Sequence, residues 1–411
     1  MRWLIRGWLM NSTPDSSSDN SEVLLHRRSP GIRVLSDTFK SRGAKLGAGW
    51  LALLAVAAVF APLLANSRPL LNRVNGIISS PAFIYLTPMD FTLLVMFMVA
   101  VILFFLPLSF RKKVLLFGVA LTATWMLAVE FINPPKLSVY ETDRELKSEI
   151  SADWVVHAPI PYSPKDYLRD YGDTGLQAPT YSADRIHLMG TTENGADLFS
   201  RMIHSSRLAL GIGLVATGIA IAIGVIVGGL MGYFAGIVDM LGMRLVEIFE
   251  AVPTLFLLLT FVAFFDRSIY IMMVIIGLTS WPGYARYVRA EFLRLRQQDF
   301  VQAAVASGIP LVSIFFRHIL PNAFAPVLVA ASFGVASAIL AEATLSFLGL
   351  GLVDDPSWGQ MLNQAVRSST FNWWMALFPG GAIFLTVFSY NLIGESLRDA
   401  LDPLTHHSES P

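Results

Sequence analysis

Long apolar runs dominate the sequence, and they limit the chain to folds that use a lipid bilayer as part of their solvent. Each run is close to the roughly 20 residues that an α-helix needs to cross the hydrocarbon core. Charged residues make up 15% of the chain, whereas soluble proteins average about 25%. The sequence therefore predicts an all-α, polytopic membrane helix bundle with about eight spans, at residues 46–65, 91–110, 114–132, 208–235, 246–265, 269–287, 324–347 and 374–394.

Basic residues gather beside these runs in three places, and they predict the orientation. Lys and Arg are enriched in cytoplasmic loops. A chain of alternating spans with a cytoplasmic N-terminus brings all three clusters to the cytoplasmic side, and the C-terminus with them. The clusters are Arg27, Arg28, Arg33, Lys40, Arg42 and Lys45, then Arg111, Lys112 and Lys113, and then Arg289, Arg294, Arg296 and Arg317.

The runs also divide the chain into parts. A polar tract near the N-terminus, at 11–22, cannot pack a core and is typical of a disordered tail. The long polar segment at 133–207 is expected to lie outside the membrane, and its pattern predicts no fold. The parts are a cytoplasmic tail at 1–45, three spans within 46–132, the external segment at 133–207, five spans within 208–395 and a cytoplasmic tail at 396–411.

Motifs of the common enzyme classes are missing from the sequence. It has no G-x-x-x-x-G-K-S/T phosphate loop, no H-E-x-x-H and no G-x-S-x-G. It has no cysteine for disulfides or thiolate ligands, and its net charge of zero gives no basic excess for nucleic acid. We therefore expect no cofactor, no metal site and no nucleic acid partner, and an integral membrane enzyme stays possible only without a visible catalytic constellation.

Two other classes of membrane protein fit less well, and a third stays open. A secondary transporter should show inverted repeats or broken helices with midplane charges. A membrane enzyme should carry a polar catalytic set within its spans. Only isolated carboxylates are present, and a charge in lipid is costly. A scaffold subunit remains open. Of the carboxylates Glu130, Glu247, Glu250, Glu342 and Glu395, we expect all but Glu342 to reach the interface, whereas Glu342 faces either the interface or the bundle interior.

The segment between the sixth and seventh runs is too apolar for an ordinary cytoplasmic loop. An alanine-rich helix is predicted to end at Gly308, and Pro310 suits the start of a second helix that runs to Ile319. Leu320, Pro321 and Asn322 are expected to end it. An exposed apolar helix usually marks a partner interface, and packing against its own bundle is the open alternative. Its large apolar residues are Leu311, Val312, Ile314, Phe315 and Phe316.

Residues 299–322 resemble the coupling loop of ABC-importer permeases, closest to the dipeptide and oligopeptide permease C type of the peptide/nickel branch. That family has Glu-Ala-Ala, three residues and Gly, and this chain has Gln302-Ala303-Ala304, three residues and Gly308. Short stretches at 65–71 and 159–163 resemble the microcin-C-type subgroup. The resemblance spans roughly 185–404, through segments at 190–207, 232–244, 281–291, 345–359, 377–380 and 391–403.

The resemblance implies a type I ABC importer transmembrane fold in a bacterial plasma (inner) membrane. The chain would form half of a pore for peptides or peptide-like solutes. Its implied partners are a second permease subunit, two ABC ATPase subunits that hydrolyse ATP, and an external solute-binding protein. Two phenylalanines would anchor the second helix of the loop in a groove on one ATPase. The implied coupling residues are Gln302, Ala303, Ala304, Gly308, Pro310, Phe315, Phe316 and Arg317.

Three questions stay open at this level. The family usually has one span before its external segment, so the extra pair at 91–132 is either an insertion with its own role or packing for a partner. Pore-lining residues are not assigned, and the substrate class ranges over peptides, nickel chelates and cell-wall fragments. Close helix packing is the expected use of most glycines in the fourth run, Gly211, Gly213, Gly218, Gly224, Gly228, Gly229 and Gly232.

Overall fold

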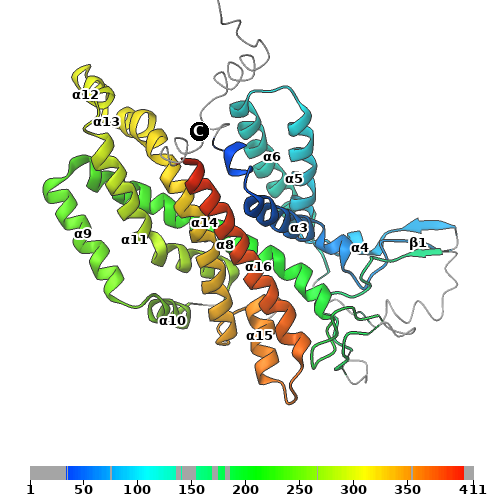
Figure 1. The fold of residues 1–411 in the computed structure, drawn as a ribbon. Coiled ribbons are helices and arrows are strands. Elements are labelled where there is room, and N and C mark those ends of the chain that lie inside the picture. Colours follow the sequence, from blue (N-terminus) through cyan, green and yellow to red (C-terminus); the bar gives the residue numbers. More distant parts are fainter. Residues whose placement is uncertain are drawn as a thin grey trace, which may run out of the picture.

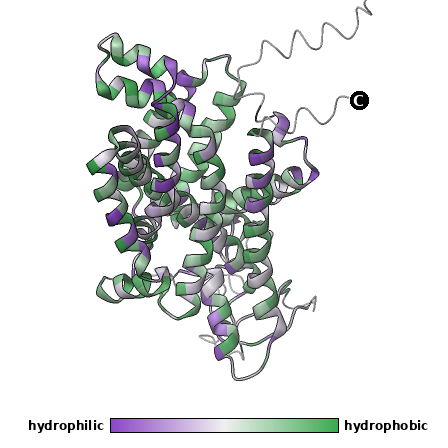
Figure 2. Cartoon of the chain, turned by 60° about the vertical axis from the view of Figure 1, so that its left-hand side comes forward, coloured by the Kyte–Doolittle hydropathy of each residue, from purple (hydrophilic) through white to green (hydrophobic). Residues whose placement is uncertain are grey.

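The protein is a bundle of long helices with a small sheet at one side (Figure 1). The predicted tails lie largely outside the described residues. Six described helices are long and apolar enough to cross a membrane, and hydrophobic residues predominate along them (Figure 2). They are α3 (Arg42–Leu64), α5 (Pro88–Phe105), α6 (Phe110–Phe131), α8 (Leu198–Phe234), Leu311–Phe347 and α16 (Trp373–Leu401). The computed structural model describes residues 34, 36–74, 76–135, 140, 154–168, 175–180, 186–265, 267–352 and 355–401.

The predicted span at 246–265 is wrong as a continuous helix. The chain forms α9 (Gly236–Ala251) and α10 (Thr254–Phe264), which are bent by 80° at the break between them. Pro253 has no N–H to donate and disfavours helical backbone at the residue before it. Val252 is accordingly extended, with φ −92° and ψ 124°. As a broken span, this pair brings the number of candidate spans to seven.

The predicted span at 269–287 lies within α11 (Ile269–Leu295), which is not among the candidate spans. Its second half is more polar and carries Arg286, Arg289 and Arg294. The described residues thus hold six or seven candidate spans rather than eight.

Helices α8 and α11 approach so closely that backbone meets backbone. A Cβ atom added at Gly228 would lie 2.3 Å from the Ala285 carbonyl oxygen, and one at Gly232 would lie 2.6 Å from the Arg289 carbonyl oxygen. Small residues at four-residue spacing let transmembrane helices pack in this way. The predicted packing role is therefore confirmed at these glycines. Gly218, by contrast, has open space around its Cβ position.

A three-stranded antiparallel sheet, which the sequence did not predict, lies beside the bundle. Its order is β2 (Ile77–Ser79), β1 (Leu71–Val74), β3 (Trp154–Val156), and α4 (Pro81–Ile84) follows β2. The third strand comes from the predicted external segment, and the first two follow α3. That segment ends earlier than expected, because Asp197 caps α8 by accepting from Ser200 N at 2.7 Å.

The two ends of the bundle carry different features (Figure 1). One end holds the turn between α5 and α6, the segment α12 (Asp299–Ala306) to α13 (Leu311–Ser313), and the C-terminal end of α16. The other holds α10 and α15 (Trp358–Arg367). The described members of the three basic clusters therefore lie toward one end, as a single alternating topology requires.

Candidate functional site

A sharp turn at Gly308 joins α12 to the helix that follows it. The Ile309 N–H donates to the Ala304 carbonyl at 3.2 Å, and the Gly308 N–H donates to Val305 at 3.0 Å. These two bonds form a Schellman motif, which needs a left-handed residue at its turn. Gly308 supplies it with φ +70°, and a Cβ there would touch nothing. The predicted helix end at Gly308 is correct. Glycine is favoured there because the backbone is left-handed, and not because a side chain would lack room.

The second helix does not end at Leu320, Pro321 and Asn322, so that expectation is wrong. Instead α13 continues through a π-helical turn, η2 (Ile314–Ile319), directly into α14 (Leu320–Phe347). The Leu320 N–H donates five residues back to Phe315. A π turn lies just before Pro321, which cannot donate a helical hydrogen bond. The coupling segment and a predicted span are therefore one uninterrupted helix.

The two adjacent phenylalanines of this helix have different surroundings. Phe315 is 6% exposed and its ring centroid lies 4.7 Å from that of Phe292 on α11. The absence of a side chain at Gly229 makes room for the Phe315 ring. Phe316 is 52% exposed. The expectation of two anchors for a partner therefore fails at Phe315, which fixes the segment to its own bundle.

The exposed side chains on this helix form what we term the coupling surface, Leu311, Val312, Phe316 and Arg317. Val312 is the most exposed of the three apolar members, at 69%. Pro310, at the start of the helix, is exposed as well. One face of the helix packs against its own bundle and the other faces outward. The predicted partner interface on the outward face stays a prediction.

Residues of α12 complete the segment. Ala304 is buried in the cluster around Phe292, whereas Gln302 and Ala303 are exposed. The Gln302 Nε2 atom donates to the Arg296 carbonyl at 2.8 Å and ties α12 to the end of α11. A glutamate, which the related family has here, could not donate this bond when ionised. The departure from the family pattern thus has a local structural use.

Ion pairs that the sequence pattern did not predict join α9 to α11 behind the segment. Arg289 binds Asp239 through two nitrogens, with Nη2 and Oδ2 2.6 Å apart, and Arg286 pairs with Glu250. Arg296 Nη1 donates to the Tyr233 carbonyl at 2.9 Å. Two of these arginines, Arg289 and Arg296, belong to the third basic cluster. The partners of all three arginines lie 36 to 63 residues earlier in the chain, so no local pattern pairs them.

The remaining glutamates differ in exposure, and their expected position at the membrane interface stays a prediction for all but Glu342. Glu130 and Glu395 are exposed, and Glu247 pairs with Arg244. Glu342 is 2% exposed and accepts from Ser346 Oγ at 2.6 Å, so it faces the interior.

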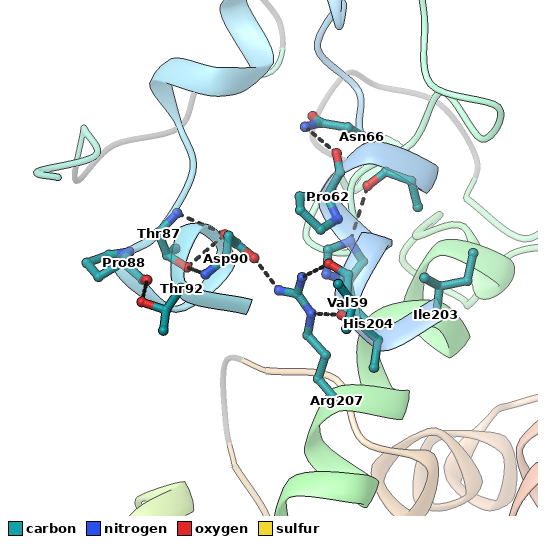
Figure 3. Close-up of polar contacts among 12 residues, drawn as sticks. Val59, Pro62, Asn66, Thr87, Pro88, Asp90, Thr92, Ile203, His204 and Arg207 are labelled. Atoms are coloured by element: carbon teal, nitrogen blue, oxygen red, sulfur yellow. Dashed lines mark hydrogen bonds and ion pairs between the residues drawn. The ribbon is translucent and has the colours of Figure 1, made fainter. Parts of the chain in front are cut away.

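Arg207 on α8 attaches the extra helix pair to the bundle (Figure 3). Its guanidinium pairs with Asp90 on α5 and donates to two carbonyls of α3, one of them that of Ala58. The Ala58 carbonyl lacks its helical donor because the residue four positions on is Pro62. Asp90 also accepts from the Thr87 N–H at 2.8 Å in a capping box. This polar junction is nearly buried, with 12% and 10% of the two side chains exposed.

Comparison with known proteins gives a consistent set of similarities. The family of binding-protein-dependent transport system inner membrane components matches residues 220–407. The oligopeptide transport system permease protein OppC of Haemophilus influenzae is 38% identical over 232 residues, 56% of this chain and 75% of that protein. The dipeptide transport system permease protein DppC of Alkalihalophilus pseudofirmus is 38% identical over 249 residues, 60% of this chain and 80% of that protein.

Among solved structures, an inward-facing form of the MetNI methionine ABC transporter covers 50% of this chain and 98% of its own, with TM-score 0.42 and 18% identity. The family match at 220–407 contains the whole coupling surface and leaves α5, α6 and Arg207 outside it.

Proposed function

Because this chain belongs to the peptide ABC permeases of the oligopeptide and dipeptide type, in which separate ATPase subunits hydrolyse ATP, we propose that its coupling surface docks on one of these ATPase subunits. The observation that carries this proposal is the contrast between two neighbours. Phe315 holds the helix in the bundle, and Val312 and Phe316 extend from the same helix into open space. A groove on a partner would bury both, and buried aromatic residues are common interface anchors.

The same proposal gives the orientation and the partners. The end of the bundle with the basic clusters lies in the cytoplasm, beside the ATPases. The opposite end, with α10 and α15, faces the external solute-binding protein. A second permease subunit completes the pore, and peptides or peptide-like solutes are the cargo.

Movement of the ATPase reaches the membrane through stiff connections. The coupling surface is continuous with α14, so a displacement of η2 moves α14 as well. Phe315 against Phe292 carries the displacement to α11, and the Arg289–Asp239 pair carries it to α9. Rigid-body shifts of packed helices of this kind switch a pore between two states.

The test is a pull-down of the tagged chain in mild detergent, with its partners co-expressed and identified by mass spectrometry. The variant replaces Val312 and Phe316 by Ser. Its matched control replaces Val366 and Phe371 by Ser, which are 71% and 87% exposed at the opposite end. We expect the first variant to retain the second permease and lose the ATPases, and the control to retain both. ATPases retained by the first variant would contradict the docking proposal.

A further inference from the structure

A cavity of about 160 Å³ lies where α8, α11 and α14 meet. Small and hydroxyl-bearing side chains dominate its lining, among them Thr217, Ser280, Tyr284, Gly334 and Ser337. Ser280 and Ser337 are exposed, so the cavity opens on the surface between α11 and α14. Thr217 and Tyr284 form its buried end, at 5% and 7% exposed.

The hydroxyls at the buried end lack well-formed hydrogen bonds. Among the described residues, neither Thr217 Oγ1 nor Tyr284 Oη has a hydrogen-bond partner of good geometry, and the two make at most one weak contact with each other. One shared bond would still leave a donor unmatched, and a buried polar group without a partner is costly. Tyr284 reaches this position because Gly334 has no side chain, since a Cβ there would lie 1.5 Å from Oη. The arrangement leaves buried hydroxyls facing a space that a polar ligand can enter.

The other side of α11 carries a cavity of a different kind. It measures about 290 Å³ and is lined by apolar and aromatic residues of α10 and α11, including Phe261, Val274 and Leu278. Such a lining suits lipid chains. Ser280 and Leu278 therefore lie two residues apart on one helix and line cavities of opposite character.

We propose that the hydroxyl-lined cavity is a binding site on the translocation path for the main chain of a peptide in transit. The proposal rests on the proposed permease function and adds a contact site to it. Hydroxyls both donate and accept, so they match the N–H and C=O groups that every peptide carries. The five named lining residues carry no charge, which favours binding that is independent of the peptide's side chains.

The first test uses the absence of cysteine from the native chain. Ser280→Cys and, as matched control, Leu278→Cys are introduced separately into the assembled transporter in proteoliposomes that admit reagent to both faces. A charged, water-soluble thiol reagent is applied with and without trialanine under transport conditions. We expect trialanine to slow labelling of the cysteine at 280 at least about fivefold, and the cysteine at 278 to react poorly. A labelling rate at position 280 that is the same with and without trialanine, or equal labelling at both positions, would overturn the proposal.

The second test removes the hydroxyls without changing shape. Thr217→Val and Tyr284→Phe should each slow trialanine uptake about 2- to 10-fold, the size of one neutral hydrogen bond. Thr217→Ser should restore it, and the amount of co-purified ATPase should stay constant. Unchanged uptake with a raised Tm would show that the hydroxyls merely hold water, and would overturn the cavity proposal alone. Absence of ATP-driven uptake in the unmodified transporter would overturn the permease function as well.

Discussion

Helices α8 and α11, and the extra pair α5 and α6, are held in the molecule by opposite means. The first two meet through glycines, backbone against backbone, along much of their length. In the extra pair, α5 contacts α3, and α6 packs mainly against α5. Within their most apolar windows, 39% of α8 residues are buried and only 11% of α6 residues. A substitution in the contact between α8 and α11 therefore forces neighbouring helices to repack, whereas the extra pair α5 and α6 is attached to the bundle at its edge.

We expect the attachment to depend more on its polar junction than on apolar packing. Arg207 lies on the core side, and it satisfies both a carbonyl freed by Pro62 and the carboxylate of Asp90. A buried charge that loses its partner is strongly destabilising. We therefore expect the two regions to respond to different mutations, and the following predictions are arranged from the largest effect to the smallest.

Breaking the glycine contact should be the most damaging change. Gly228→Leu forces a side chain against the Ala285 carbonyl, which is backbone and cannot rotate away. We expect a loss of about 3 kcal/mol or more and little folded protein. The matched control is Gly218→Leu on the same helix, where an added Cβ has no atom within 4 Å. Equal yields and equal Tm for the two variants in detergent would contradict the packing account.

Removing Arg207 should release the extra pair and leave the core folded. Arg207→Met strands the Asp90 charge, at a cost of about 3 kcal/mol. Phe60 and Phe97 have ring centroids 5.0 Å apart, across α3 and α5. Cysteines at these two positions therefore report the attachment when a bifunctional thiol reagent cross-links them.

We expect Arg207→Met to reduce this cross-link strongly, and a further Asp90→Asn to restore part of it. Lys165→Met, which breaks an exposed pair with Asp355, is the control and should leave cross-linking unchanged. A cross-link that is insensitive to Arg207→Met would mean that apolar packing alone holds the pair.

Two glycines at opposite ends of the core offer a sharper comparison. Gly308 and Gly349 have φ +70° and +84°. Each closes a Schellman turn, and the bond into the second turn joins Leu350 N to the Leu345 carbonyl at 3.0 Å. Alanine in a left-handed conformation costs about 1 kcal/mol at either site. We expect Gly308→Ala to weaken ATPase binding about fivefold and Gly349→Ala to leave it unchanged, as measured by titrating ATPase onto the reconstituted permease pair.

The smallest expected effect is a pH dependence at the opposite end. Glu193 accepts hydrogen bonds from Ser368 Oγ at 2.6 Å and Ser369 N at 2.8 Å, and these bonds lower its pKa below the usual 4.5. A lowered folded-state pKa adds stability above pH 4.5 that is lost as the pH falls through the folded-state value. The Tm advantage over Glu193→Gln should be slight near pH 7 and disappear once the pH falls below the folded-state pKa of Glu193. A difference that grows in acid would contradict this account.

The apolar runs predicted most of the helices because length and hydropathy fix a membrane helix almost alone. Pro253 shows where that signal fails, since one residue in a long apolar run divides α9 from α10. Pro321 gave the opposite error: a helix end was predicted there, but a π turn lets the helix continue past it. Local sequence marks a proline but does not tell how the neighbouring backbone accommodates it.

The sequence motif located the coupling segment, but it did not predict which side chains of the segment are buried. Phe315 and Phe316 are the same residue type, and contacts with other helices, at Gly229 on α8 and Phe292 on α11, distinguish the buried one from the exposed one. The Arg207–Asp90 junction joins residues 117 positions apart, and the hydroxyl cavity needs three helices to form. Such features depend on tertiary contacts that no local pattern contains.

ATP-driven uptake of a radiolabelled tripeptide into proteoliposomes is the most direct test of the central claim, that this chain transmits ATPase movement through its coupling surface. The complete transporter is compared with one in which Val312 and Phe316 are both Ser. We predict that uptake and peptide-stimulated ATP hydrolysis are lost together in the variant, while Tm and assembly with the second permease are retained. Normal uptake by the variant would contradict the claim.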